Sequence, residues 1–132
     1  MRIYNASGNE ICVLKGHTDL VRHAVFSPND KYVLTSSFDK SVRLWFLDLA
    51  DSKEVVKLGG HEDKVNCGRF SSDGLKVVTA DMNGIARIFA VDTVSGVLTE
   101  SEINPLHVLP KTGGLNWAEF QPNNSDMLVT AG

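Results

Sequence analysis

A histidine, a threonine and an aspartate in the first third of the chain have the side chains needed for acid–base chemistry. His17 follows a glycine, Thr35 lies in an apolar run and Asp39 lies in a turn. A hydroxyl, an imidazole and a carboxylate are the parts of a hydrolase triad, in which the carboxylate orients the imidazole base. The same imidazole is also a possible metal ligand or a part of the framework. The elements that surround these residues decide between the three roles.

A repeat with a spacing of 44 residues surrounds them. The stretch "GHTDLVRHAVF" at 16–26 matches "GHEDKVNCGRF" at 60–70. The same offset relates Val21 to Val65, Phe26 to Phe70, Thr35 to Thr79 and Arg43 to Arg87. A third copy, "LNWAEFQPNNSDMLVTAG", lacks the Gly-His pair. An internal period of this length is typical of a repeat architecture.

The residue composition of each copy is typical of short β-strands. The segments "VRHAVF", "KYVLTSS", "SVRLWF" and "EVVKL" are rich in β-branched and aromatic residues, and turn signals such as "SPNDK" and "FDKS" separate them. Four such segments predict a four-stranded antiparallel unit for each repeat and an all-β chain. The acidic, Ser/Thr-rich stretch at 91–105 is predicted to be a long loop, and its "TESE" at 99–102 is interpreted as solvated rather than as a docking site for a basic partner.

Composition limits the classes of function. The chain has 132 residues, of which 42% are hydrophobic and 22% charged, and its net charge is −3. A mildly acidic chain has no electrostatic reason to bind nucleic acid or a membrane, and no apolar run is long enough to span a bilayer. The first residues lack the apolar core of a signal peptide. Cys12 and Cys67 have no paired spacing and are interpreted as two free thiols. We therefore expect a cytoplasmic or nuclear protein that is not secreted, with neither a metal nor another cofactor.

The repeats resemble those of the WD40 family over essentially the whole chain. The best copy is "GHTDLVRHAVFSPNDKYVLTSSFDKSVRLWF", which has the Gly-His pair and the Asp-x-x-Val-Arg-Leu-Trp pattern at the family's spacing. The resemblance implies that each repeat forms one blade of a β-propeller. Departures are present, because Phe46 replaces the Asp after the tryptophan, and Phe89 and Asn83 replace the Trp and the turn Asp of the second copy.

The resemblance also implies a role for the histidines. In this family the loop His, a strand Ser/Thr, the turn Asp and the strand Trp form a hydrogen-bonded chain across a blade, so we expect one chain of His17, Thr35, Asp39 and Trp45 and a second, poorer chain of His61, Thr79 and Asn83. A catalytic centre is usually single, whereas a framework device recurs. The repetition therefore favours a structural role and indicates that the protein is not an enzyme.

Blade boundaries follow from the same alignment. We expect a half blade of third and fourth strands at 1–15, complete blades at 16–59 and 60–110, and a half blade of first and second strands at 111–132. These pieces sum to three blades, and a closed propeller has roughly 4–8. The chain is thus interpreted as a segment of a larger propeller whose other blades are supplied in cis or in trans. The alternative is a self-assembling fragment that closes a ring with other copies.

The resemblance finally implies a partner-binding face at one end of the blades. It carries Leu20, Arg22, Phe38, Lys64, Asn66, Met82, Gly114 and Asn116. Phe38 is the most informative member, because turn residues are usually polar or glycine and an aromatic residue beside Met and Arg is typical of an interface centre. Trp117 falls on an inner strand, where core packing is favoured over ligand contact. The predicted function is a non-catalytic scaffold for protein–protein interaction, with a partner of unknown identity.

Overall fold

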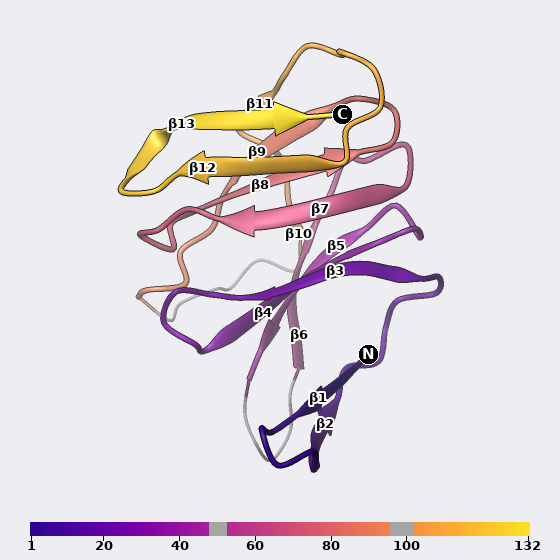
Figure 1. Cartoon of the computed structure of the whole chain (residues 1–132), viewed down its shortest axis with the longest axis vertical. Coiled ribbons are helices and arrows are strands. Elements are labelled where there is room, and N and C mark those ends of the chain that lie inside the picture. Colours follow the sequence, from indigo (N-terminus) through magenta and orange to yellow (C-terminus); the bar gives the residue numbers. More distant parts are fainter. Residues whose placement is uncertain (48–52, 96–101) are drawn as a thin grey trace.

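The computed structural model describes residues 1–47, 53–95 and 102–132 of the chain. Throughout these ranges the regular secondary structure is β-strand, arranged in four sheets that follow one another along the chain (Figure 1). The sheets are antiparallel apart from one short parallel pairing, and they do not close into a ring. The all-β prediction and the prediction of a partial propeller are confirmed.

The first complete blade has four antiparallel strands in sequential order: β3 (Val21–Phe26), β4 (Tyr32–Ser37), β5 (Val42–Phe46) and β6 (Lys53–Leu58). The second has β7 (Val65–Phe70), β8 (Lys76–Asp81), β9 (Ala86–Ala90) and β11 (His107–Val108). All six residues of β4 are buried, because this strand lies between β3 and β5 within its sheet and between neighbouring sheets on its faces.

Corresponding turns of the two blades share one backbone conformation. Asp30 and Lys40 have φ of 61° and 69°, and the equivalent residues Gly74 and Gly84 have φ of 74° and 85°. A left-handed residue is needed at each of these turns, and glycine adopts that conformation without steric cost. The repeat therefore extends to the backbone, even where the residue type differs.

A two-stranded sheet lies at each end of the molecule (Figure 1). The N-terminal sheet pairs β1 (Arg2–Tyr4) with β2 (Glu10–Val13), and the C-terminal sheet pairs β12 (Trp117–Gln121) with β13 (Asn124–Ala131). Both pairings are antiparallel. The segments expected to form the half blades thus contain two strands each.

Apolar side chains fill the spaces between successive sheets. Leu34 and Phe89 belong to the central cluster between the two complete blades, Ala118 belongs to the cluster under β12, and Trp45 belongs to the cluster beside β1. Removal of this apolar surface from water is the main force that holds sheets face to face. No helix in the described ranges is long and apolar enough to cross a membrane.

The predicted loop at 91–105 contains a strand. β10 (Glu102–Ile103) pairs in parallel with β6 and so adds a fifth strand to the outer edge of the preceding blade. Ile103 packs on the central cluster, and its carbonyl accepts a hydrogen bond from the Gly59 amide at 3.0 Å. The prediction of a long loop over 91–105 was wrong at 102–103, because the edge of β6 offers backbone groups with which two extended residues can form hydrogen bonds. Of the "TESE" segment only Glu102 lies within the described residues.

Candidate functional site

His17 is the centre of a hydrogen-bonded chain in the first blade. Its Nε2 lies 2.6 Å from Thr35 Oγ1, and its Nδ1 lies 2.7 Å from Asp39 Oδ2. The indole of Trp45 donates to the same threonine oxygen at 2.9 Å. The tautomer that satisfies every contact carries its proton on Nδ1, so that Trp45 donates to Thr35, Thr35 to His17, and His17 to Asp39. These are the four residues that the sequence indicated.

The carboxylate of Asp39 is held ionised by this arrangement. Burial alone would raise its pKa, but hydrogen bonds from Ser41 and His17 and from the Thr18 amide bring the pKa well below its usual range. Backbone amides and hydroxyls that favour the charged form have this effect on a carboxyl group.

The same geometry leaves the triad without a free nucleophile. Thr35 is buried, and its oxygen already contacts both His17 and Trp45. A nucleophile must reach a substrate carbon with its base beside it, and this hydroxyl faces the interior of the blade. The arrangement is suited to fixing the loop before β3 onto β4 and β5.

The second blade carries a related chain with a different acid. His61 Nε2 lies 2.7 Å from Thr79 Oγ1, and His61 Nδ1 lies 2.9 Å from Asp81 Oδ2. The prediction that Asn83 fills this place was wrong, because Asp81 at the end of β8 reaches the imidazole from two residues earlier. The Asn83 amide oxygen instead accepts a hydrogen bond from Lys111 at 2.8 Å.

Arg87 completes the second chain. Its Nη1 donates to Asp81 Oδ2 at 2.8 Å and lies 2.8 Å from His61 Nδ1. Burial lowers the pKa of His61, the hydrogen bond to Asp81 raises it, and the charge of Arg87 lowers it again, so that the net pKa lies below the ordinary 6.5. The pKa of Asp81 is also lowered, because hydrogen bonds from His61 and the Ile85 amide outweigh burial. A neutral imidazole between a carboxylate and a threonine is therefore the stable state.

Sequence signals for Asp81 were present but ambiguous. Asp81 aligns with Ser37, whose hydroxyl lies 2.9 Å from the Leu20 carbonyl oxygen and takes no part in the histidine chain. Phe89 supplies no N–H donor in place of Trp45, so a different set of polar partners is needed in this blade. Only the turn after β8 decides which of two nearby side chains meets the imidazole.

The predicted partner face is built from turns and loops of both blades. The Lys64 ammonium lies 5.0 Å from the centroid of the Phe38 ring, within the range of a cation–π contact. The Phe38 amide donates to the Leu20 carbonyl, and the Met82 amide donates to the Lys64 carbonyl, so each turn is tied to the loop before its own blade. Leu20 and Met82 are both exposed. These four residues are called the Phe38 face below.

The other predicted face residues lie around this group. Asn66 donates to the Leu115 carbonyl at 2.8 Å, the Asn116 amide donates to the Ala131 carbonyl, and Gly114 approaches the Met82 carbonyl. Arg22 is exposed on β3. The Asn66 side chain thus joins the second blade to the segment before β12, whereas the Asn116 hydrogen bond lies within the C-terminal part of the chain.

Trp117 packs between inner strands of three sheets. Its ring meets His23 edge-on at 5.6 Å between centroids, and the Arg69 guanidinium lies 4.2 Å from its centre. His23 Nδ1 lies 3.2 Å from the Gly68 carbonyl oxygen, and burial together with Arg69 lowers the His23 pKa. These contacts agree with a packing role for the indole.

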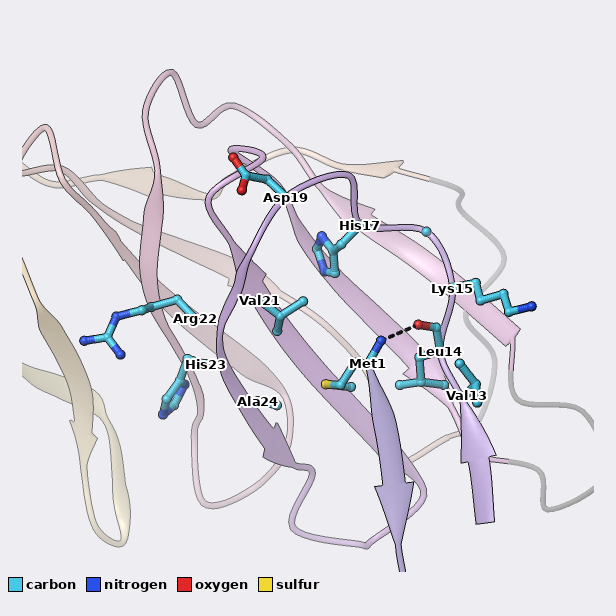
Figure 2. A pocket seen from close by; sticks show the side chains of 11 residues that line it. Met1, Val13, Leu14, Lys15, His17, Asp19, Val21, Arg22, His23 and Ala24 are labelled. Carbon is cyan, nitrogen blue, oxygen red and sulfur yellow. Dashed lines mark hydrogen bonds between the residues drawn. The ribbon is translucent and has the colours of Figure 1, made fainter. Parts of the chain in front are cut away.

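A groove of about 640 Å³ lies between the N-terminal sheet and β3 (Figure 2). Its lining includes Met1, Leu14, Val21 and Ala24, and the Met1 ammonium donates to the Leu14 carbonyl at 2.9 Å. Among the residues that the structure describes, no three His, Cys, Asp or Glu side chains gather as metal ligands would. The lining offers no pairing of a nucleophile with a base.

Comparison with known proteins agrees with this geometry. The family described as "WD domain, G-beta repeat" matches residues 8–45 and 52–89, which is more than half of the chain. The chain is 59% identical over 32 residues to the Notchless protein homolog of Arabidopsis thaliana, covering 24% of this chain and 7% of that protein. It is 39% identical over 57 residues to nuclear distribution protein nudF 1 of Talaromyces marneffei, covering 43% of this chain and 12% of the relative.

A third relative is ribosome assembly protein 4 of Saccharomyces cerevisiae, which is 44% identical over 39 residues. That match covers 30% of this chain and 8% of the yeast protein. The chain therefore spans only about a tenth of the length of these relatives. The repeated blades, the histidine chains and the family match together show that this chain belongs to the WD40 repeat family.

Proposed function

We propose that this chain is a non-catalytic scaffold that binds a protein partner through the Phe38 face. The observation that carries the proposal is the contact between Lys64 of one blade and Phe38 of the other, with Leu20 and Met82 exposed beside them. Aromatic, Met and cationic side chains are the ones that dominate binding energy at interface centres. An apolar surface at this place has no evident role in the fold of either blade.

The chemistry of the Phe38 face defines the partner. An apolar side chain of the partner would pack on Phe38, Leu20 and Met82, and an acidic group would pair with Lys64. The relatives are named for different processes, so the shared segment supports binding in general rather than ribosome assembly or nuclear distribution in particular. We propose an intracellular setting, cytoplasmic or nuclear.

Peptide selection tests this proposal directly. Peptides that bind the chain would be selected from a random library, and their dissociation constants measured for the wild type and for Phe38→Ala. We expect the substitution to weaken binding by about 1–4 kcal/mol, because centres of this composition carry much of the binding energy. Thermal stability should change little, since a turn tip contributes little to the core.

Two further variants make the test specific. Leu75→Ala removes an exposed leucine from the turn at the opposite end of the second blade and should bind as the wild type does. Lys64→Glu should weaken the binding of acidic peptides more than the binding of other peptides. Normal binding by Phe38→Ala, or equal losses for Phe38→Ala and Leu75→Ala, would contradict the proposed face.

A further inference from the structure

The first strands of three successive sheets bring a histidine, an arginine and a tryptophan together. β7 packs against β3 on one side and against β12 on the other. His23 comes from β3, Arg69 from β7 and Trp117 from β12. All three side chains are partly buried. These residues are called the Arg69 cluster below.

A bulge near the start of β3 adds a second arginine beside this cluster. The register of β3–β4 shifts between Val21 and His23, so that Arg22 is an extra residue in β3. A bulge interrupts the alternation of side chains along a strand and changes their direction. In Figure 2 the side chains of Arg22 and His23 both point away from the N-terminal sheet. Two consecutive residues of β3 therefore contribute to the same region.

The imidazole of His23 is oriented by the neighbouring blade. Its Nδ1 lies 3.2 Å from the Gly68 carbonyl oxygen. Because a carbonyl oxygen only accepts hydrogen bonds, Nδ1 carries the proton, and Nε2 of the neutral ring is an acceptor. The ring also meets Trp117 edge-on. The direction of Nε2 is thus fixed by contacts with both neighbouring sheets.

Arg69 is held by an aromatic ring rather than by a carboxylate. Its guanidinium lies 4.2 Å from the centre of the Trp117 ring, and its Nε is buried without a hydrogen-bond partner. Glu119 is nearby on β12, but its carboxylate accepts from the Trp117 indole N–H at 3.3 Å. Among the described residues no carboxylate lies within ion-pair distance of Arg69. A buried N–H group costs free energy until an acceptor reaches it.

The charges around His23 are of one sign. Burial lowers the pKa of His23, the charges of Arg69 and Arg22 lower it further, and the hydrogen bond with the Gly68 carbonyl raises it. The net pKa lies below the ordinary 6.5. The electrostatic potential at the imidazole is therefore positive, and an anion beside it would offset that potential.

We propose that Arg69, His23 and Arg22 form a binding site for an oxyanion, which is the carboxylate or phosphate group of a ligand. The Nε and one Nη of Arg69 form the fork that donates two parallel hydrogen bonds to two oxygens of such a group. Trp117 holds the plane of the guanidinium by a cation–π contact, and Arg22 supplies a second positive charge. The site shares no residue with the Phe38 face.

NMR titration of the 132-residue chain with inorganic phosphate, acetate and chloride at constant ionic strength tests the site. The chain has two tryptophans, so two indole N–H signals report separately. We expect phosphate or acetate to shift the Trp117 signal saturably. The Trp45 signal should stay in place, because that indole is buried and bound to Thr35. The oxyanion with the lower dissociation constant identifies the ligand group as a phosphate or a carboxylate.

Substitutions assign the binding to the Arg69 cluster. Arg69→Gln removes the fork and its charge and should raise the dissociation constant about tenfold or more. Arg69→Lys keeps the charge without the fork and should bind more weakly than the wild type but more tightly than Arg69→Gln. Arg22→Gln changes an exposed residue, so it should weaken binding without disturbing the fold. Arg2→Gln removes the same charge from an exposed arginine on β1 and should bind as the wild type does.

The protonation of His23 gives an independent measurement. A bound oxyanion offsets the charges of Arg69 and Arg22, so the midpoint of the His23 titration should move to higher pH when the tighter-binding oxyanion is present. Chloride at the same ionic strength should leave the midpoint unchanged. A contact between Arg69 and Trp117 that serves packing alone would make the midpoint independent of both anions. The Trp45 indole signal verifies that each variant is folded.

Three outcomes overturn the proposal. The first is the absence of a saturable Trp117 shift with either oxyanion, and the second is an equal shift with chloride. The third is wild-type affinity in both Arg69→Gln and Arg22→Gln. A saturable response to an oxyanion that Arg69→Gln weakens and Arg2→Gln retains supports it.

Discussion

At the scale of the residue, the two blades hold the histidine of the incoming loop with different side chains. In each blade a histidine ties the incoming loop to a strand threonine. In the first blade Asp39 binds the imidazole, and the Trp45 N–H donates a hydrogen bond to the threonine oxygen. The second uses Asp81 and balances its charge with Arg87. The shared requirement is an imidazole between two strands whose two ring nitrogens both have hydrogen-bond partners.

Substitution of Asp81 and Asn83, the two candidates for the partner of His61, separates their roles. Asp81→Ala should lower the free energy of unfolding by about 1–3 kcal/mol or more, because it leaves Arg87 and His61 buried without their acceptor. Asn83→Ala removes only an exposed contact with Lys111 and should change the free energy by less than about 0.5 kcal/mol. Chemical denaturation measures both. A larger loss for Asn83→Ala would restore the assignment made from sequence.

The lowered pKa of His61 gives stability a defined pH dependence. Protonation of His61 favours the unfolded state, so its stabilising effect is complete above about pH 6.5 and is lost as the pH falls from there towards the folded pKa. Asp81 and Asp39 have lowered pKa values, so their contribution is present above about pH 4 and is lost below it.

Denaturation midpoints measured from neutral to acid pH check this dependence. We expect the free energy of unfolding to begin to fall below about pH 6.5. Its slope should be at most about 1.4 kcal/mol per pH unit for His61 alone. His61→Gln should reduce this first loss, whereas His107→Gln, which changes an exposed histidine, should not. An unchanged profile in His61→Gln would refute the assignment.

At the scale of the element, the contact between blades depends on one glycine in β7. Gly68 in β7 is buried, and a Cβ atom there would lie 2.6 Å from Ser36 Oγ and 3.0 Å from Leu34 Cδ2. The close approach lets β7 pack directly on β4. β10 adds a second link between the blades, since it returns from the second blade to the edge of β6 in the first.

Gly68→Val should therefore separate the sheets. We expect the free energy of unfolding to fall by about 1–3 kcal/mol, as for other overpacked core positions. Ala90→Val adds bulk at the exposed end of β9 and should be close to neutral. Thermal denaturation of both variants gives the comparison. Equal stability of Gly68→Val and the wild type would show that the sheets are free to move apart.

At the scale of the whole molecule, each sheet is stabilised by its neighbours. The central cluster takes Leu34 and Val56 from one blade and Val77 and Phe89 from the other, so neither blade has a core of its own. The two end sheets have such a neighbour on one side only. Val129 and Tyr4, which lie on the two end sheets, are correspondingly exposed.

The sequence by itself determined the repeat and the strand segments, and its resemblance to the WD40 family implied the hydrogen-bonded chain centred on His17. Strand patterns and turn residues depend on neighbours along the chain, and the 44-residue spacing repeats them with the same chemistry. The strand segments of the half blades followed from the same alignment, since "RIYN" and "MLVTAG" carry the patterns of "RLWF" and "YVLTSS".

Only the tertiary structure decided which side chain contacts His61 Nδ1, where residues 102–103 pair and how Lys64 contacts Phe38. Asp81 and Asn83 are two residues apart, and the turn between them determines which side chain turns inward. β10 pairs with a strand more than forty residues earlier, and Phe38 and Lys64 come from different blades. Such contacts depend on how sheets pack in space, and local patterns of residue type do not specify that packing.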